Sequence, residues 1–341
     1  MFQRTALVGA FLVSCVALPG AALADPVEEF YRGKNLRMLI GAGIGGGNDT
    51  YARFLGRHMT RHIPGNPTIV PQNIPGGAGT QAAASLYNVA PRDGSVIAAV
   101  NRATGFDPLF TGRDYKFDPR QFTWLGSLNK ETNLIVAWHT APVKTAADMF
   151  TTEMVLGAAS AGADSAVYPR LINALLGGKF RVVTGYDGEQ ASLATEKGEV
   201  DGRASMPWTT LKTLHPDWVR DKKVNIIVQM ALERDPELPD VPNILDFVKD
   251  PEDRALFEAL FSRQEMGRPF VAPPEVPADR VRALRGAIPA TLADPVFQAE
   301  AEKAGIDIQY VDGEQIERLI RRAYALPPGV LKRIREALNP S

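Results

Sequence analysis

The sequence predicts an α/β fold made of two domains with a cleft between them. Short runs of β-branched and apolar residues alternate with amphipathic stretches, the pattern of helices packed on mainly parallel sheets. Proline clusters at 236–242 and 269–277, together with an expected turn at Gly126-Ser127, indicate that the chain passes between two halves. Its 341 residues are enough for two buried cores.

Strands are expected at 36–40, 68–72, 95–100, 133–138, 154–158, 180–184, 199–203, 224–230 and 268–272. The clearest helix follows the first of them, where Asn48 or Asp49 can cap the N-terminus and Pro64-Gly65 ends the pattern. Its apolar stripe falls three or four residues apart, at Ala52, Leu55, Met59 and Ile63. Further helices are expected at about 80–89, 277–293 and 313–325.

We expect a discontinuous domain arrangement. One domain would combine residues 25–126 with 266–341, and the other would hold residues 127–265. Two crossing segments between α/β halves form a hinge, and a hinge places a ligand cleft between the halves.

The N-terminus predicts export to the periplasm. Arg4 precedes an apolar run at 5–18, and Ala22-Leu23-Ala24 is a small-x-small cleavage pattern, so residues 1–24 are read as a signal peptide. The run is too short for a stable membrane span. An alternative is a lipoprotein tether, because Leu12-Val13-Ser14-Cys15 resembles a lipidation box. Cys15 is the only cysteine, so cleavage after Ala24 would leave no disulfide, thiolate nucleophile or cysteine metal site.

The charge balance excludes one large class of partner. Lysine and arginine number 38 against 39 aspartate and glutamate, a net charge of −1. A generally basic surface of the kind that binds nucleic acid is therefore not expected.

Two glycine-rich loops are the strongest local signals. Gly41-Ala-Gly-Ile-Gly-Gly-Gly-Asn-Asp49 lies between the first expected strand and helix, and Asn73-Ile-Pro-Gly-Gly-Ala-Gly-Thr80 follows the second strand. Glycine lets the backbone approach a ligand closely, and a helix N-terminus favours an anion. Loops after neighbouring parallel strands meet at the carboxyl edge of a sheet, where open α/β folds bind ligands.

A dinucleotide fold is the main rival interpretation of the first loop. Gly41, Gly43 and Gly46 satisfy G-x-G-x-x-G, but the confirming acidic residue about twenty positions later is missing, because the next strand ends at Gln72-Asn73. A simpler alternative is that the glycines only serve tight turns.

The two loops also carry a family resemblance. YRGKNLRMLIGAGIGGGNDTYAR and NIPGGAGTQAAASLYNVAPRDGSVI resemble the substrate-binding receptors of tripartite tricarboxylate transporters, the Bug-type proteins. Gly157-Ala-Ala-Ser-Ala-Gly162, Gly198-Glu-Val-Asp201 and Leu238-Pro-Asp-Val-Pro242 extend the likeness over nearly the whole chain. The resemblance implies a type II periplasmic-binding fold, closure around a carboxylate held largely by backbone amides and waters, and delivery to a membrane permease. It implies no cofactor and a monomer.

Carried over by position, the resemblance implies ligand contacts from both domains. They are Gly46, Gly47, Asn48 and Asp49, then Gly77, Ala78, Gly79 and Thr80, and from the facing domain Ser160, Ala161, Gly162, Asp164, Ser165, Tyr186, Asp187 and Gly188. The chain departs from the family pattern at Ile44, Asn48 and Asn101-Arg102, which leaves the ligand's identity open. Because like charges repel, we expect Asp49 and Asp164 to cap a helix, or to bind an amine or a water, rather than contact an anion.

Arg102 follows an expected strand and has two interpretations. It could grip a second carboxylate in bidentate fashion, which would favour a dicarboxylate or aromatic acid. It could instead pair with a surface acid such as Asp107.

Other chemistries have weaker support in the sequence. His58 and His62 lie four apart on a helix but lack a third metal ligand, and Ser160 lies outside the G-x-S-x-G pattern of hydrolases. We therefore predict no metal site and no catalysis. A secreted enzyme on the same scaffold and a receptor that feeds a sensor protein stay open as alternatives. Aromatic residues near loop edges are expected mainly in packing, with some able to stack on a ligand: Phe106, Phe110, Trp138, Tyr168, Tyr186 and Trp208.

Overall fold

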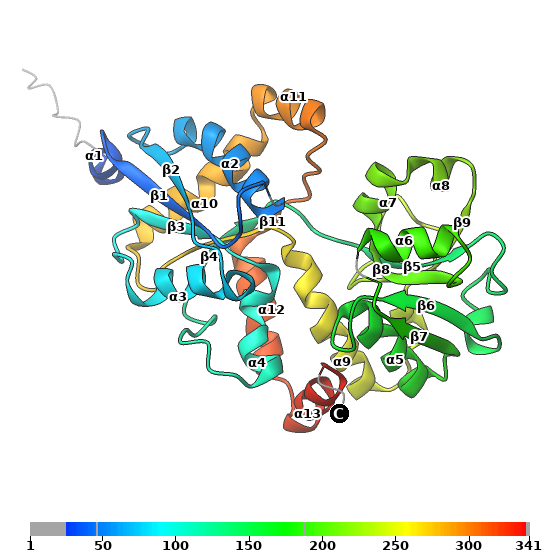
Figure 1. The fold of residues 1–341 in the computed structure, drawn as a ribbon. Coiled ribbons are helices and arrows are strands. Elements are labelled where there is room, and N and C mark those ends of the chain that lie inside the picture. The colour runs from blue at the N-terminus through cyan, green and yellow to red at the C-terminus, as the bar shows by residue number, and fades with distance from the viewer. Residues whose placement is uncertain (1–24, 46, 187, 339–341) are drawn as a thin grey trace, which may run out of the picture.

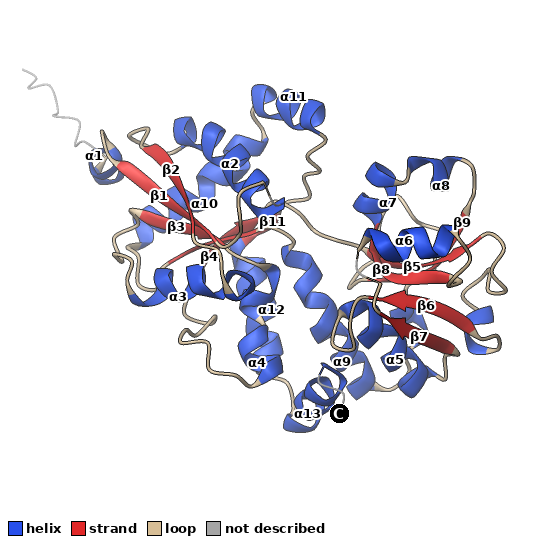
Figure 2. Cartoon of the chain, in the orientation of Figure 1, coloured by secondary structure: helices blue, strands red, loops and turns tan. Residues whose placement is uncertain are grey.

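The chain folds into two lobes, each built on its own sheet (Figure 1). This computed structural model describes residues 25–45, 47–186 and 188–338. The expected signal peptide and Cys15 therefore lie outside the described residues, as do Gly46 and Asp187. Helices flank both sheets (Figure 2), so the predicted α/β class is confirmed.

The first lobe contains a six-stranded sheet in the order β11-β4-β10-β3-β1-β2. Its strands are β1 (Asn35–Ile40), β2 (Thr68–Asn73), β3 (Val96–Ala99), β4 (Thr123–Ser127), β10 (Pro269–Ala272) and β11 (Val311–Asp312). The second lobe contains a five-stranded sheet in the order β7-β6-β8-β5-β9. These strands are β5 (Asn133–Trp138), β6 (Met154–Ala158), β7 (Phe180–Thr184), β8 (Gly202–Pro207) and β9 (Val224–Met230).

The expectation of mainly parallel sheets is wrong, because both sheets are mixed. β1 pairs in parallel with β2 and β3, whereas β10 runs antiparallel to β3 and β4. In the second lobe β5 runs antiparallel to β8 and β9, while β6 pairs in parallel with β7 and β8. β10 enters the first sheet from the other lobe rather than through a helical crossover, which gives it the opposite direction.

Two local predictions also need correction. Gly126 and Ser127 form the end of β4 rather than a turn, at a bulge opposite β10, where a Cβ on Gly126 would lie 2.8 Å from the Tyr310 ring. The strand expected at 199–203 begins only at Gly202, because Gly198 adopts φ +71° in the turn after the preceding helix. β4 and β11 were not among the strands expected from the sequence.

The helices expected from apolar periodicity are present. They are α2 (Gly47–Met59), α3 (Thr80–Asn88), α10 (Ala278–Leu292) and α12 (Gly313–Tyr324). The first lobe also has α1 (Pro26–Tyr31), α4 (Asp107–Thr111) and α11 (Pro295–Ala304), and the second has α5 (Asp164–Leu176), α6 (Glu189–Glu196), α7 (Trp208–Leu214) and α8 (Pro216–Arg220). α9 (Pro251–Phe261) and α13 (Pro328–Leu338) lie where the lobes meet at their base (Figure 1). Across the described ranges, every helix is too short or too polar to pass through a membrane.

The chain passes between the lobes in two segments that lie side by side. Residues 128–132 connect β4 to β5, and residues 262–268, which include the 3-10 helix η6 (Ser262–Met266), lead back to β10. Backbone hydrogen bonds join the two passes: Leu128 N donates to Arg268 O at 3.1 Å, Gly267 N to Asn129 O at 2.8 Å, and Glu131 N to Gln264 O at 3.0 Å. These two passes are called the crossing segments below.

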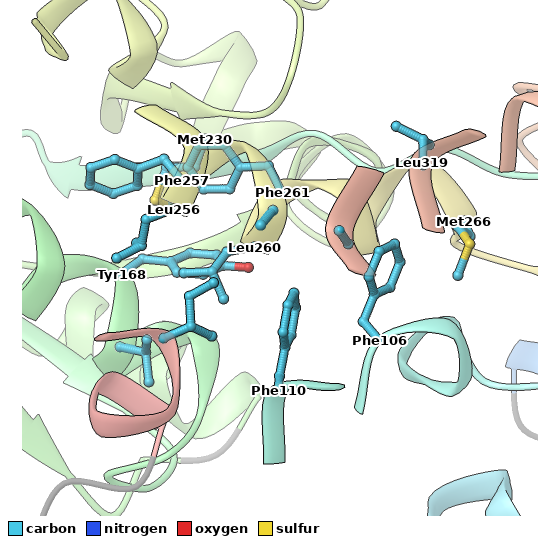
Figure 3. Packing of buried hydrophobic residues seen from close by; sticks show 14 of the residues in the cluster. Phe106, Phe110, Tyr168, Met230, Leu256, Phe257, Leu260, Phe261, Met266 and Leu319 are labelled. Atoms are coloured by element: carbon cyan, nitrogen blue, oxygen red, sulfur yellow. The ribbon is translucent and has the colours of Figure 1, made fainter. Parts of the chain in front are cut away.

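Beneath the crossing segments, one apolar cluster continues from the first lobe into the second. Figure 3 shows Phe106 and Phe110 of the first lobe in the same cluster as Phe257 and Phe261 of α9 and Tyr168 of α5. The Tyr168 and Phe261 rings meet edge to face at 5.4 Å between centroids. The base of the molecule is therefore a core shared by the two lobes.

Substitution of Gly202 tests how closely β8 approaches β5. A Cβ at this position would lie 2.0 Å from the Val136 carbonyl oxygen, so Gly202→Ala should lower the free energy of unfolding by about 1–3 kcal/mol or more. Gly286 is the control: it is exposed within α10 with open space around it, and Gly286→Ala should stabilise by about 0.5–1 kcal/mol. Urea unfolding of both variants measures this, and equal stabilities would contradict the strand register.

Candidate functional site

The two glycine loops converge, as their positions after adjacent strands predict. β1 and β2 run in parallel with Ile40 opposite Asn73. The loops then touch through backbone alone, since a Cβ on Gly41 would lie 3.1 Å from the Gly79 Cα. Gly79 is buried with φ +93°, a conformation that suits glycine. Side chains at either position would push the loops apart.

Asp49 holds the first loop in place. Its carboxylate is 2% exposed and accepts hydrogen bonds from Gly45 N at 2.9 Å, Arg53 Nε at 2.8 Å and Asn73 Nδ2 at 2.8 Å. Burial raises the pKa of this carboxyl, but the hydrogen bonds from Asn73, Gly45 and Arg53 outweigh it and leave the pKa below its ordinary value. Asp49 therefore organises the loop, and both of its carboxylate oxygens are already engaged by donors of the protein.

The structure places a cavity of about 400 Å³ between the lobes, called the central cavity here. It is lined by Ala42, Gly47, Asn48, Asn101, Arg102, Glu131, Pro207, Gly267 and Arg268. Gly47 and Asn48 are at the start of α2, Arg102 begins the 3-10 helix η3 (Arg102–Gly105) after β3, and Pro207 ends β8 of the other lobe. Both lobes and both crossing segments thus contribute to one space.

A chain of alternating charges runs along this cavity. Glu131 accepts from Arg102 Nη1 through one carboxylate oxygen and lies 3.4 Å from Arg268 Nη1 through the other. Arg102 Nη2 is also 3.8 Å from Asp164 at the start of α5. Arg102 therefore pairs with acids of the protein, although not with Asp107, which lies 3.7 Å from Arg263. Arg102 also lines the central cavity.

A second cavity of about 240 Å³ opens into the second lobe and is called the second-lobe cavity. It is lined by Arg102, Gly157, Ala159, Ala163, Asp164, Ser165, Tyr186, Gly188, Ala191, Arg203, Ala204 and Ser205. Arg102 is common to both cavities. The sequence-derived residues Asp164, Ser165, Tyr186 and Gly188 therefore come together here, at the starts of α5 and α6.

Gly77, Thr80, Ser160, Ala161 and Gly162 are not among the residues that line either cavity. In the second loop, Gly77 and Ala78 lie in the 3-10 helix η2 (Gly77–Gly79), and the Thr80 hydroxyl donates to the Gly77 carbonyl at 2.8 Å. Ser160, Ala161 and Gly162 form a turn near the end of α13, since a Cβ on Gly162 would lie 2.9 Å from Leu338 O. Gly46 and Asp187 lie outside the described residues.

Sequence reasoning missed the charged residues Glu131, Arg203 and Arg268. Glu131 and Arg268 are on the crossing segments, whose side-by-side course no local pattern reveals. Arg203 lies in the strand expected at 199–203. Its charge could have marked it as a site residue, because an arginine on a buried strand needs partners or a ligand.

The two histidines considered as metal ligands each contact a carboxylate. His58 Nε2 in α2 lies 3.2 Å from Glu300 in α11, and His62 Nε2, just after α2, lies 3.1 Å from Asp294, the N-cap of α11, so each imidazole faces a carboxylate. Within the described residues, no group of three or more His, Cys, Asp or Glu side chains is arranged to hold a metal ion. Of the aromatic residues considered, Tyr186 lines a cavity, whereas Phe106, Phe110 and Tyr168 are fully buried.

Comparison with known proteins finds a family model and several solved structures to which this chain is similar. The family model described as tripartite tricarboxylate transporter family receptor, TctC, matches residues 52–334. Among curated protein sequences, none matches the chain.

Solved structures share the fold at low sequence identity. A TctC solute-binding protein from Polaromonas, solved without ligand, aligns with TM-score 0.71 and 16% identity over 89% of this chain and 99% of its own. The periplasmic binding protein BugD aligns with TM-score 0.56 and 22% identity over 90% and 98%. An R. palustris protein with adipate aligns with TM-score 0.59 and 18% identity over 89% and 97%.

Asp49→Asn tests whether this carboxylate holds the first loop. Near pH 7 the variant should lose about 1–3 kcal/mol of unfolding free energy, because an amide cannot accept at both positions. The folded-state pKa lies below the ordinary value of about 3.9, so the wild-type contribution is present above that pH and is lost as the pH falls through the folded pKa. The difference in unfolding free energy between the wild type and Asp49→Asn should therefore become smaller in acid. Asp240→Asn, at an exposed position, should leave stability unchanged, and a gap independent of pH would contradict the assignment.

Proposed function

Because the chain belongs to the tripartite tricarboxylate transporter receptor family, we propose that it is a periplasmic receptor that captures a small carboxylate and delivers it to a membrane permease. The observation that carries the proposal is the central cavity, in which the start of α2 faces Arg102 and Arg268. An R. palustris protein of the same fold was solved with adipate, a dicarboxylate, which supports this ligand class.

The central cavity combines two kinds of attraction for negative charge. Gly47 and Asn48 begin a thirteen-residue helix, whose first backbone N–H groups lack intrahelical partners and whose dipole favours an anion. Arg102 and Arg268 add two guanidinium groups against the single carboxylate of Glu131. The lining therefore carries an excess of positive charge, as an anion receptor requires.

Closure would complete the site. We propose that residues 25–126 with 266–341 and residues 127–265 act as two domains that approach each other by bending at the crossing segments.

The proposed ligand contacts are Gly46, Gly47, Asn48, Gly77, Ala78, Gly79, Thr80, Arg102, Ser160, Ala161, Gly162, Ser165, Tyr186, Asp187 and Gly188, with Asp49 and Asp164 as supports. Glu131, whose two oxygens face Arg102 and Arg268, is suited to positioning cations rather than moving a proton. The proposed action is binding and release by a monomer, without a covalent step.

Gly47→Asp tests this function through a thermal-shift screen against small carboxylic acids. A bound ligand raises the unfolding midpoint by mass action on the native state. A carboxylate at position 47 would repel the ligand and meet Arg268, whose Nη2 lies 3.1 Å from the added Cβ, so the ligand-induced shift should disappear. The unliganded midpoint should change little.

Gly43→Asp is the matched control, since a Cβ there meets open space in the same loop. It should retain the shift. Retained binding in Gly47→Asp would remove the start of α2 from the site, and the absence of any carboxylate-induced shift in the wild type would overturn the proposed ligand class.

Glu131→Gln tests whether the protein's own carboxylate competes with the ligand for Arg102 and Arg268. Removing the negative charge should tighten carboxylate binding several-fold, because charge-assisted hydrogen bonds to the two guanidinium groups contribute about 1.5–3 kcal/mol each. Glu265→Gln is the control: this buried acid lies 3.2 Å from Lys130 and is absent from the central cavity lining. Calorimetric titration measures both, and equal or weaker binding in Glu131→Gln would contradict competition between Glu131 and the ligand.

A further inference from the structure

Arg268 of the central cavity lies on the face of an aromatic ring. Its guanidinium carbon is 5.2 Å from the centroid of the Tyr51 ring, within the range in which an arginine and an aromatic face attract each other. Tyr51 belongs to α2, and Arg268 belongs to the crossing segment that leads into β10. The contact therefore joins the helix that begins at the cavity to one of the two cavity arginines.

Gly47 makes room for this contact one turn earlier on α2. Gly47 and Tyr51 are four residues apart, so they lie on the same face of the helix. A Cβ at Gly47 would lie only 3.1 Å from Arg268 Nη2, so a side chain there would force the guanidinium to shift. The absence of a side chain at Gly47 thus lets the guanidinium lie against the first turn of α2, beside the Tyr51 ring.

Hydrogen bonds fix only one nitrogen of the Arg268 guanidinium. Nη1 donates to the Gly267 carbonyl at 2.6 Å and lies 3.4 Å from a Glu131 oxygen. Among the described residues, the buried Nε has no hydrogen-bond partner, and the contacts of Nη2 include no acceptor. Because a buried N–H without an acceptor is unfavourable, hydrogen bonds alone do not explain this orientation, and the ring face supplies the missing attraction.

The Tyr51 ring is itself held in place away from the ligand. Its hydroxyl donates to the Asp307 backbone carbonyl at 2.9 Å, and the ring packs against the apolar cluster that contains Ile40 and Phe270. Tyr51 is absent from the described lining of the central cavity. Any effect of the ring on a ligand in that cavity would therefore pass through Arg268.

We infer that Tyr51 is a positioning residue for carboxylate binding, whose ring holds Arg268 with Nη2 directed toward the start of α2. The inference rests on the proposed function. One carboxylate of the ligand then meets the guanidinium and the first backbone amides of α2 together. Because the arginine is oriented before the ligand arrives, less of its side-chain freedom is lost on binding. Without the ring, Arg268 keeps its charge but is free to turn away from α2.

The test removes the ring and measures binding by calorimetric titration of the full chain with acetate, succinate and adipate. Tyr51→Leu should weaken binding by about three- to tenfold, the loss expected for one arginine–ring attraction. Tyr51→Phe keeps the ring face and loses only the hydroxyl, so its affinity should stay within about twofold of wild type. Tyr310→Leu is the matched control and should bind as wild type, because Tyr310 packs against the same apolar cluster but lies outside the cavity lining.

A double-mutant cycle separates the positioning of Arg268 from a general effect on α2. In an Arg268→Met background, Tyr51→Leu should change the affinity by less than about twofold, because no guanidinium is left to position. Tyr51→Met keeps more of the side-chain length and replaces Tyr51→Leu if that variant fails to fold. Wild-type affinity in the variant without the ring, or an equal loss in both backgrounds, would overturn the inference. A wild-type protein that binds none of the three acids would instead overturn the proposed function, so the two failures are distinguishable.

Discussion

The hydrogen bonds between the two crossing segments are the constraint on which the site depends. Gly267 shows how close the passes are, since a Cβ there would lie 2.4 Å from Asn129 Oδ1. Glu131 and Arg268 are carried by these same passes, one on each. The residues that set the charge of the central cavity are thus fixed to the segments that would bend in the proposed closure. In that proposal, ligand binding and closure would be mechanically linked.

The charge chain has a consequence for affinity. A ligand carboxylate that approaches Arg102 meets an arginine already engaged by Glu131 and close to Asp164. Binding therefore exchanges one charge-assisted contact for another, and the net gain is smaller than that of a carboxylate meeting a solvated arginine. In the proposed site, the backbone amides at the start of α2 would supply the general attraction for anions, while the arginines would supply selectivity.

Much of the fold could be predicted because its signals are local. The α2 stripe, with Leu55 and Met59 buried, follows directly from apolar spacing, and the glycine loops follow from strand–helix punctuation. The short strands β4 and β11 could not be found, because Gly126 at a bulge looks like a turn and Val311–Asp312 is too brief to show a pattern. The residues of the site also fall into those that local sequence signals predict and those that they do not. Gly47, Asn48 and Arg102 follow from loop position, whereas Glu131 and Arg268 depend on how distant segments pair.

The shared core limits how the lobes can move. Phe106 and Phe110 pack in one cluster with α9 and α5, and α13 contacts α9, α4 and α5. Separating the lobes completely would expose these aromatic side chains, at a cost of about 1.5–3 kcal/mol for each large apolar residue. A rotation about the base would keep these aromatic side chains buried. In the proposed closure such a rotation would move Pro207 of β8 relative to Gly47, across the central cavity that both residues line.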